Sequence, residues 1–161
     1  MTTPTTISLT AFIPGVPAPQ GSKTAVLRGR RPVLIEASKT TAPWRATITA
    51  HVRQAMTGQI NGPVKVACVF YFPRPASHFG TGRNAGMVRP GAPSIYKATK
   101  PDLDKLLRAV LDGVTDAGAW RDDSQVAQLS AVKRWADAEK PGGGGVHLTI
   151  SRLHDRTEVA S

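Results

Sequence analysis

The sequence predicts a single α+β domain, in which two main helices pack on a mixed or antiparallel β-sheet. One observation is size: the 161 residues, of which 40% are apolar, suffice for one hydrophobic core. The other is the order of the periodic segments, which runs strand, hairpin, helix, strand, helix, strand, strand. No segment repeats. We therefore expect one domain over residues 1–153, followed by a tail over residues 154–161.

The chain begins with segments typical of a strand and a hairpin. The stretch "ISLTAFI", residues 7–13, predicts the first strand, and a loop rich in proline and glycine follows it. The segments "AVLRG" and "RPVLIE" predict a short hairpin. Its tip is basic and comprises Arg28, Gly29, Arg30 and Arg31.

The first helix is predicted over residues 41–58, where apolar residues recur at helical spacing. We expect Thr41 to cap this helix, Pro43 to lie in its first turn and Gly58 to end it. A strand over residues 64–72 follows, and it is apolar on both of its faces. It should therefore be a central strand that is covered on both sides.

The single cysteine, Cys68, lies in this strand. One thiol excludes an internal disulfide and a cysteine-based zinc site. We interpret Cys68 as a small buried core residue.

Residues 73–100 predict a long, basic and flexible arm, because they contain no acidic residue and no regular periodicity. Long irregular segments in compact domains are often functional, and this composition favours binding to phosphates. A plain flexible insertion is the alternative. The DNA-binding residues predicted in the arm and in the segments before it are Lys23, Arg28, Arg30, Arg31, Arg74, Arg83, Arg89, Lys97 and Lys100.

The second helix shows a strong amphipathic pattern in "KPDLDKLLRAVLDG". We expect Pro101 in its first turn and Gly118 at its end. Two further strands are predicted, the first over residues 125–135 and the last over residues 146–153.

Charge is distributed very unevenly along the chain. The formal net charge is +10, which suggests a polyanionic partner such as nucleic acid. Residues 1–101 contain thirteen Lys or Arg and one acid, whereas residues 102–161 contain eight Lys or Arg and ten acids. Six of the eleven acids fall between residues 102 and 123. A basic surface around a small acidic focus is what a metal-dependent enzyme acting on a polyanion needs.

Two interpretations of the aspartates compete. Asp102 and Asp104 could simply stabilise the start of the second helix, an effect of about 0.3–1 kcal/mol each. Metal binding instead requires extended backbone at Asp102, so that the two side chains converge, and a further acid from elsewhere. Asp122 and Asp123 are candidates, although they could also form a solvated turn. To reach the helix start, they need a strand that returns beside the helix or a partner subunit, and their spacing leaves both routes open.

Several motifs are absent, and their absence excludes other kinds of active site. The sequence has no histidine spacing typical of a metal site, no phosphate-binding glycine loop and no serine or cysteine nucleophile motif. Carboxylate ligands would favour Mg²⁺, with Mn²⁺ as a substitute. The chemistry left is metal-assisted hydrolysis of a phosphodiester, with Lys105 or Arg108 balancing the developing charge.

The stretch "KPDLDKLLRAVLDGVTDAGAWRDDSQV" resembles the signature of the RusA family of Holliday junction resolvases. The family pattern is D-L-D, an amphipathic helix and then G-x-W-x-D-D-x-Q-[VI]. The resemblance implies a RusA-like fold and a dimeric, Mg²⁺-dependent endodeoxyribonuclease that makes paired symmetric nicks in four-way DNA junctions. It also implies metal ligation by Asp102, Asp104 and Asp123, with Asp122 beside them. Arg108 occupies the position of a functionally important family lysine and keeps its charge.

Two alternatives to a junction resolvase stay open. A basic, non-catalytic DNA-binding or recombination-accessory protein could retain the same fold. A less selective nuclease could use the same chemistry. The sequence shows no membrane span and no targeting segment, and many family members come from phages. We therefore expect a cytoplasmic location in a bacterial or phage-infected cell.

Overall fold

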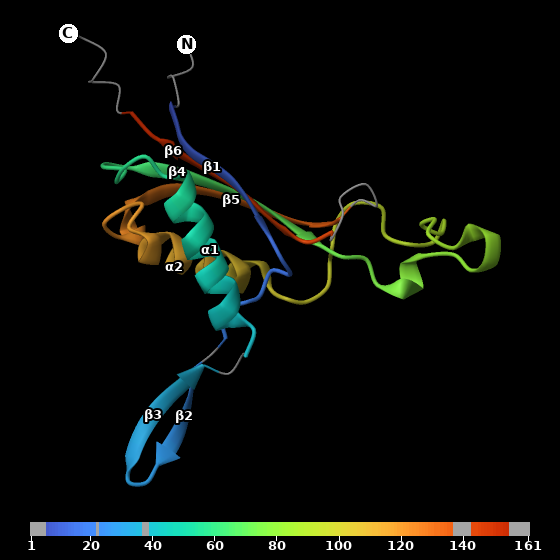
Figure 1. The fold of residues 1–161 in the computed structure, drawn as a ribbon, viewed down its shortest axis with the longest axis horizontal. Helices are drawn as coiled ribbons and strands as arrows, with labels where there is room; N and C mark the ends of the chain where they lie inside the picture. The colour runs from blue at the N-terminus through green and yellow to red at the C-terminus, as the bar shows by residue number, and fades with distance from the viewer. Residues whose placement is uncertain (1–5, 22, 37–38, 137–142, 155–161) are drawn as a thin grey trace.

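The computed structural model describes residues 6–21, 23–36, 39–136 and 143–154, except for the side chains of residues 6–7, 23–26 and 34–36. Two helices lie on one side of a four-stranded sheet, and two segments project from this body (Figure 1). The elements in chain order are β1 (Thr6–Pro14), β2 (Lys23–Arg28), β3 (Arg31–Glu36), α1 (Thr41–Ala55), β4 (Val64–Phe72), α2 (Leu103–Ala117), β5 (Val126–Trp135) and β6 (Gly145–Arg152). Short 3₁₀ turns occupy Ala76–His78, Gly82–Asn84 and Asp123–Gln125.

The main sheet is mixed, with the strand order β1-β6-β4-β5. β6 pairs antiparallel with both β1 and β4, whereas β5 runs parallel to β4. The parallel pair is joined by a crossover that contains α2, as parallel neighbours require. The predicted α+β class with two main helices on a mixed sheet is therefore confirmed.

β4 lies inside the sheet, as predicted, but only one of its faces is fully covered. Residues from Val64 to Phe72 alternate between buried and half-exposed, because α1 and α2 both pack on the same side of the sheet. The prediction that this strand is covered on both sides was therefore wrong for one face. Cys68 is on the covered face, with 2% of its surface exposed, and burial raises the pKa of its thiol to about 12. Its interpretation as a core residue is confirmed.

The start and end of α1 differ from the prediction. Thr40 is the N-cap residue, and Thr41 is the first helical residue. The hydroxyl of Thr41 is buried and donates to the carbonyl of Pro19 at 2.6 Å, so it anchors the preceding loop instead of capping the helix. The helix ends at Ala55, before Gly58, because Met56 adopts an extended conformation and packs against the core.

The two helices cross closely at a glycine. A Cβ atom on Gly113 would lie 2.7 Å from Cγ2 of Ile48, so only glycine allows this approach. Across the same crossing, the Arg45 guanidinium donates to Asp116 at 2.5 and 2.9 Å and lies 3.6 Å from Asp112. These contacts fix the position of α2 relative to α1.

α2 has the predicted apolar stripe and the predicted C-terminal glycine. Its buried residues include Leu106, Val110 and Val114, and Gly118 ends the helix with a φ of 75°. The start differs by one position. Asp102 is the N-cap residue, so Pro101 precedes the helix and does not lie in its first turn.

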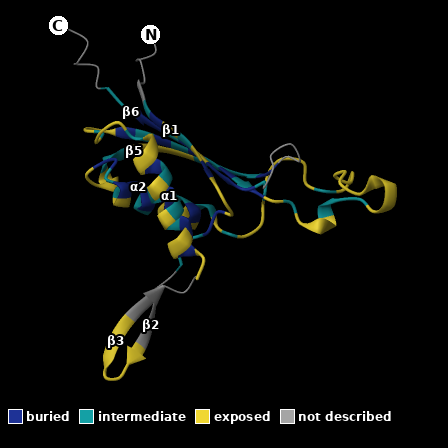
Figure 2. Ribbon diagram, in the orientation of Figure 1, coloured by how far each residue is buried: buried dark blue, intermediate teal, exposed yellow. Residues whose placement is uncertain are grey.

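The two projections are the β2–β3 hairpin and the arm, residues 73–100 (Figure 1). The hairpin is confirmed, with Gly29 and Arg30 between its strands. Where burial is described, residues 27–33 of the hairpin are exposed to solvent and so are most residues of the arm (Figure 2).

The arm is more regular than its sequence suggests. The guanidinium of Arg74 donates to the carbonyls of Pro93 and Ser94, each at 2.6 Å, and Phe79 pairs with Val88 across the arm. The predicted irregular arm therefore contains local hydrogen-bonded structure, and its flexibility stays a prediction. The tail after His154 lies outside the described residues.

Candidate functional site

Asp102 and Asp104 lie at a corner where extended backbone becomes α2. Asp102 has φ −69° and ψ 138°, and the helix begins at Leu103. This is the conformation that metal binding by both carboxylates requires. Asp102 makes no side-chain capping bond, and both aspartates are exposed to solvent. Their side chains are therefore accessible to a ligand.

Two cations accompany these carboxylates. The Nζ atom of Lys105 lies 3.4 Å from Oδ2 of Asp102. Arg108 is exposed one turn beyond Asp104 on the same flank of α2, since residues four apart are neighbours on a helix surface. The corner thus combines acceptors for a cation with donors for a phosphate.

Lys133 from β5 holds the segment before this corner. Its ammonium donates to the carbonyl of Thr99 at 2.7 Å and to that of Pro101 at 2.8 Å. These bonds fix the backbone next to Asp102. The sequence analysis did not identify Lys133, because its partners lie more than 30 residues away and are main-chain atoms.

Asp122 and Asp123 lie at the beginning of β5. Asp122 caps the 3₁₀ turn by accepting from the backbone amide of Ser124 at 2.8 Å. Hydrogen bonds from the side chain and then the backbone of Ser124 lower the pKa of Asp122. The side-chain amide of Gln125 donates through Nε2 to the carbonyls of Ile60 and Gly62, which anchors the turn to the body. Asp123 is exposed beside it.

The two acidic pairs lie at opposite ends of α2. The helix has 15 residues and is therefore about 22 Å long. β5 does return beside it, but this strand begins after Asp123 and carries Lys133 to the corner. Within the described ranges, no three His, Cys, Asp or Glu side chains form a group that could hold a metal ion. One chain therefore does not bring Asp123 to Asp102 and Asp104.

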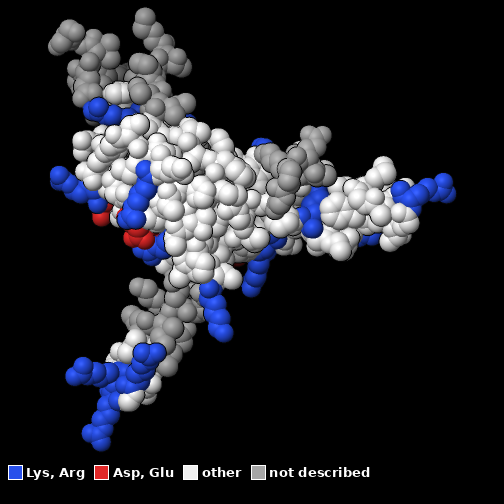
Figure 3. Space-filling view, viewed as in Figure 1, with Lys and Arg blue, Asp and Glu red and all other residues white. Residues whose placement is uncertain are grey.

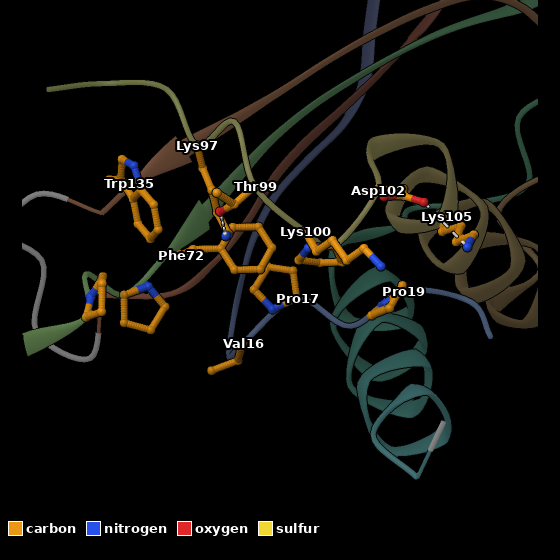
Figure 4. A pocket seen from close by; sticks show the side chains of 13 residues that line it. Val16, Pro17, Pro19, Phe72, Lys97, Thr99, Lys100, Asp102, Lys105 and Trp135 are labelled. Atoms are coloured by element: carbon orange, nitrogen blue, oxygen red, sulfur yellow. Dashed lines mark hydrogen bonds and ion pairs between the residues drawn. The ribbon is translucent and has the colours of Figure 1, made fainter. Parts of the chain in front are cut away.

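A pocket of about 780 Å³ opens beside the corner. We call it the corner pocket; its lining residues are Val16, Pro17, Pro19, Phe72, Pro73, Pro75, Lys97, Thr99, Lys100, Pro101, Asp102, Lys105 and Trp135. Figure 4 shows the side chain of Lys97 between the rings of Trp135 and Phe72. Its Nζ atom lies 4.7 Å and 5.3 Å from the two ring centroids.

The aromatic part of this pocket was not predicted. Phe72 and Trp135 end two strands that are parallel neighbours, and they occupy paired positions in the sheet. The sequence showed both aromatic residues but did not show that the strands pair in parallel. Unless the two strands are known to pair in this way, the sequence gives no reason to place Phe72 and Trp135 side by side in one pocket.

The predicted DNA-binding residues fall into several groups. Arg28, Arg30 and Arg31 are exposed at the hairpin tip, and Arg83 and Arg89 are exposed in the arm. Figure 3 shows Lys and Arg atoms at the ends of both projections.

The other predicted DNA-binding residues have different surroundings. Arg74 binds the backbone of the arm, and Lys97 and Lys100 line the corner pocket. The side chain of Lys23 lies outside the described residues.

Comparison with known proteins identifies one family. A family model described as endodeoxyribonuclease RusA matches residues 14–144, a range that contains the corner, both helices and the arm. No curated protein matches the chain. In the part of the chain that the structure describes, no helix has the length and apolar character needed to span a membrane.

Proposed function

The chain belongs to the RusA family of endodeoxyribonucleases, which resolve Holliday junctions, and we propose how its own residues perform this activity. The substrate class is branched DNA, and the reaction is hydrolysis of phosphodiesters. In our proposal the protein acts as a homodimer, uses Mg²⁺ or Mn²⁺, and makes two symmetric nicks across a four-way junction. We expect it to act in the cytoplasm of a bacterial or phage-infected cell.

The observation that carries the proposal is the acidic corner on a strongly basic protein. Mg²⁺ commonly binds through one or two carboxylates, with waters and substrate phosphates completing its coordination. Asp102 and Asp104 suit this role, because both are exposed at the corner where extended backbone becomes α2. A divalent cation bound there would polarise a phosphate oxygen and lower the pKa of a bound water.

The chain supplies the remaining contacts to the phosphate. Lys105 and Arg108 lie beside the two carboxylates and would hold the phosphate while negative charge develops on it. The exposed arginines of the hairpin and the arm would bind more distant phosphates, which carry no sequence information but set the orientation of the DNA. Lys133 would keep the corner in position.

A second copy of the chain offers a route by which Asp123 could reach the corner. The outer edge of β5 is partly covered, because residues 95–97 hydrogen-bond to residues 133–135. The stretch 126–132 has no strand on that side within the described chain. Leu129 lies at its midpoint and is 46% exposed. Uncovered edge strands readily pair with another chain.

Two-fold pairing of these edges would give the required geometry. If two β5 strands paired antiparallel about Leu129, the beginning of each would lie opposite the end of the other. Asp123 of the second copy would then approach Lys133, whose ammonium holds the backbone beside Asp102. In this arrangement each of the two active sites takes Asp102 and Asp104 from one copy and Asp123 from the other.

The primary experiment compares synthetic four-way junctions with linear duplexes and flaps, in the presence of Mg²⁺ or Mn²⁺ and with a chelator. We expect paired nicks in the junction only, and none with the chelator. Cleavage that persists with the chelator would contradict the metal assignment. Equal cutting of linear duplex would indicate a less selective nuclease.

One observation favours a second candidate function. Arg108 stands where the family pattern has a lysine, and a planar guanidinium differs from a compact ammonium. A non-catalytic DNA-binding protein would bind junctions tightly yet nick none of them in either metal. The same assay therefore separates the two candidates.

A further inference from the structure

The side chain of Gln125 binds both sides of the turn that carries Asp123. Its Oε1 atom accepts from the backbone amide of Arg121 at 2.9 Å. Its Nε2 atom donates to the carbonyl of Ile60 at 3.1 Å and to that of Gly62 at 2.9 Å. One side chain therefore joins the segment that leaves α2 to the loop that enters β4.

These hydrogen bonds require an amide at position 125. A glutamine side chain offers an acceptor oxygen and two donor hydrogens, and here the oxygen meets a main-chain amide while the nitrogen meets two main-chain carbonyls. A carboxylate would place an acceptor against those two carbonyl oxygens. An apolar side chain would leave all three main-chain groups without this partner. The chemistry of Gln125 is therefore matched to the turn.

Asp123 lies inside this network of hydrogen bonds. The backbone amide of Ser124 donates to the carboxylate of Asp122 at 2.8 Å, and the backbone amide of Gln125 donates to the carbonyl of Asp122 at 3.1 Å. Since Arg121 is held on one side and Gln125 on the other, the backbone at Asp123 is restrained from both directions. The carboxylate of Asp123 is exposed and takes part in none of the ion pairs between described residues. The network therefore orients a carboxylate that stays accessible.

We propose that Gln125 is a positioning residue, which sets the direction of the Asp123 carboxylate toward the cation of the active site. This inference rests on the proposed function, in which Asp123 reaches the corner of a second copy. A ligand that comes from another chain is oriented only by the turn that carries it. Because Mg²⁺ needs ligand oxygens in nearly ideal octahedral geometry, a loosened turn would weaken metal binding.

The test replaces Gln125 by methionine, which has a similar length but offers only a weak acceptor. Gln54→Met is the matched control, because Gln54 is an exposed glutamine on α1, outside the turn and the corner. Asp123→Asn removes the charge of the ligand itself. The double variant, Gln125→Met with Asp123→Asn, completes a double-mutant cycle. Gln125→Asn keeps the amide but is one methylene shorter, and it carries the same prediction if Gln125→Met does not fold.

Mn²⁺ affinity is measured by electron paramagnetic resonance on the full-length protein, and nicking of a four-way junction is titrated with Mg²⁺. We expect Gln125→Met to lower the Mn²⁺ affinity about tenfold, the lower range for the loss of a group that orients a metal ligand. The Mg²⁺ concentration for half-maximal nicking should rise by a similar factor, while junction affinity in Ca²⁺ stays within about threefold. In the Asp123→Asn background, Gln125→Met should cause no further loss of Mn²⁺ affinity. Gln54→Met should match the wild-type protein throughout.

Two outcomes would overturn this inference alone. One is a folded Gln125→Met protein that binds Mn²⁺ as tightly as the wild-type protein, although Asp123→Asn weakens binding. The other is an equal loss of affinity with and without Asp123→Asn, because Gln125 would then act by some route other than Asp123. If Asp123→Asn changes neither Mn²⁺ affinity nor nicking, the proposed ligand role of Asp123 fails and the inference fails with it.

Discussion

The carboxylate of Asp102 lies on extended backbone, whereas that of Asp104 lies on the first turn of α2. Two helical residues at this spacing would point about 200° apart around the axis. The extended conformation at Asp102 removes that restriction. The backbone at this corner is therefore compatible with our proposal that both aspartates bind a cation, whereas in an uninterrupted helix they would point apart.

We predict that Asp104→Asn lowers the nicking rate by at least a hundredfold and leaves junction affinity in Ca²⁺ within about threefold, because an amide keeps the shape but loses the charge that holds a cation. Nicking rates on four-way junctions and gel-shift affinities measure the two effects. Asp112→Asn is the matched control: it removes a carboxylate from the same helix, but one that lies near Arg45 and away from the corner. Equal losses in both variants would contradict the assignment.

Lys133→Met should lower nicking about tenfold and raise the Mg²⁺ concentration needed for half-maximal rate, because two hydrogen bonds from a charged donor to the corner backbone are lost. Magnesium titrations of the nicking rate provide the measurement. Lys65→Met on β4, a strand position that pairs beside β5, controls for the loss of a lysine from the sheet. A change in maximal rate without any change in magnesium dependence would assign Lys133 a different role.

At the scale of elements, the crossing of α1 and α2 determines where the corner lies. Gly113 allows the helices to approach, and the ion pairs of Arg45 join them. The Arg45–Asp116 hydrogen bond lowers the pKa of Asp116, but both side chains are substantially exposed, so the pair contributes little to stability. Close packing therefore matters more than charge at this crossing.

Gly113→Ala should destabilise the protein by about 1–2 kcal/mol, because overpacking against Ile48 outweighs the gain in helix propensity of about 1 kcal/mol. Thermal unfolding followed by circular dichroism measures this effect. Gly58→Ala is the control, since its added Cβ would meet no atom within 4 Å. A Gly113→Ala variant with raised thermal stability would show that the crossing relaxes freely.

We predict that the arm and the hairpin contribute to DNA binding through the charge of their arginines. Replacing Arg83 and Arg89 by alanine should reduce the slope of log affinity against log salt by about 2, since each phosphate contact contributes about 0.9. Junction binding at several salt concentrations gives this slope. Lys65→Ala, a change of charge within the body of the protein, should leave it nearly unaltered. An unchanged slope in the arm variant would mean that the arm does not contact phosphates.

At the scale of the whole molecule, the relevant feature is that the acidic pairs are separated by the length of α2. A single chain holds a corner with two carboxylates and a distant Asp123. Within the described chain, residues 126–132 of β5 have no strand on their outer side, and the two-fold contact that we propose there would bridge this separation. Symmetric nicking of a junction is also matched most simply by a two-fold dimer.

Mixing two inactive variants tests this shared site. Asp104→Asn and Asp123→Asn proteins, mixed under conditions that exchange subunits, should recover single-strand nicking, because one of the two sites in each heterodimer then receives only wild-type residues. Each variant alone should remain inactive. If every site belonged to one chain, both sites of the heterodimer would carry a substitution and no activity would return. Assays on a junction labelled on each strand distinguish these results.

Much of the fold could be predicted from the sequence, and the failures have identifiable causes. The α2 stripe and Gly118 depend on local spacing and were correct, as was the hairpin. Thr41 does not cap the helix, because its hydroxyl donates a hydrogen bond to the distant carbonyl of Pro19. The local order of the arm could not be predicted from the sequence, because it depends on hydrogen bonds from Arg74 to backbone atoms up to 20 residues away.

The sequence by itself determined the α+β class, the acidic focus in a basic chain and the family, because these features reside in composition, periodicity and a contiguous motif. Only the tertiary structure decided that Asp123 lies at the far end of α2 from Asp102, and that Phe72 and Trp135 form a pocket beside the corner. The physical reason is that neighbouring residues set local conformation, whereas the path of the chain through the parallel β4–β5 pair decides which distant residues meet.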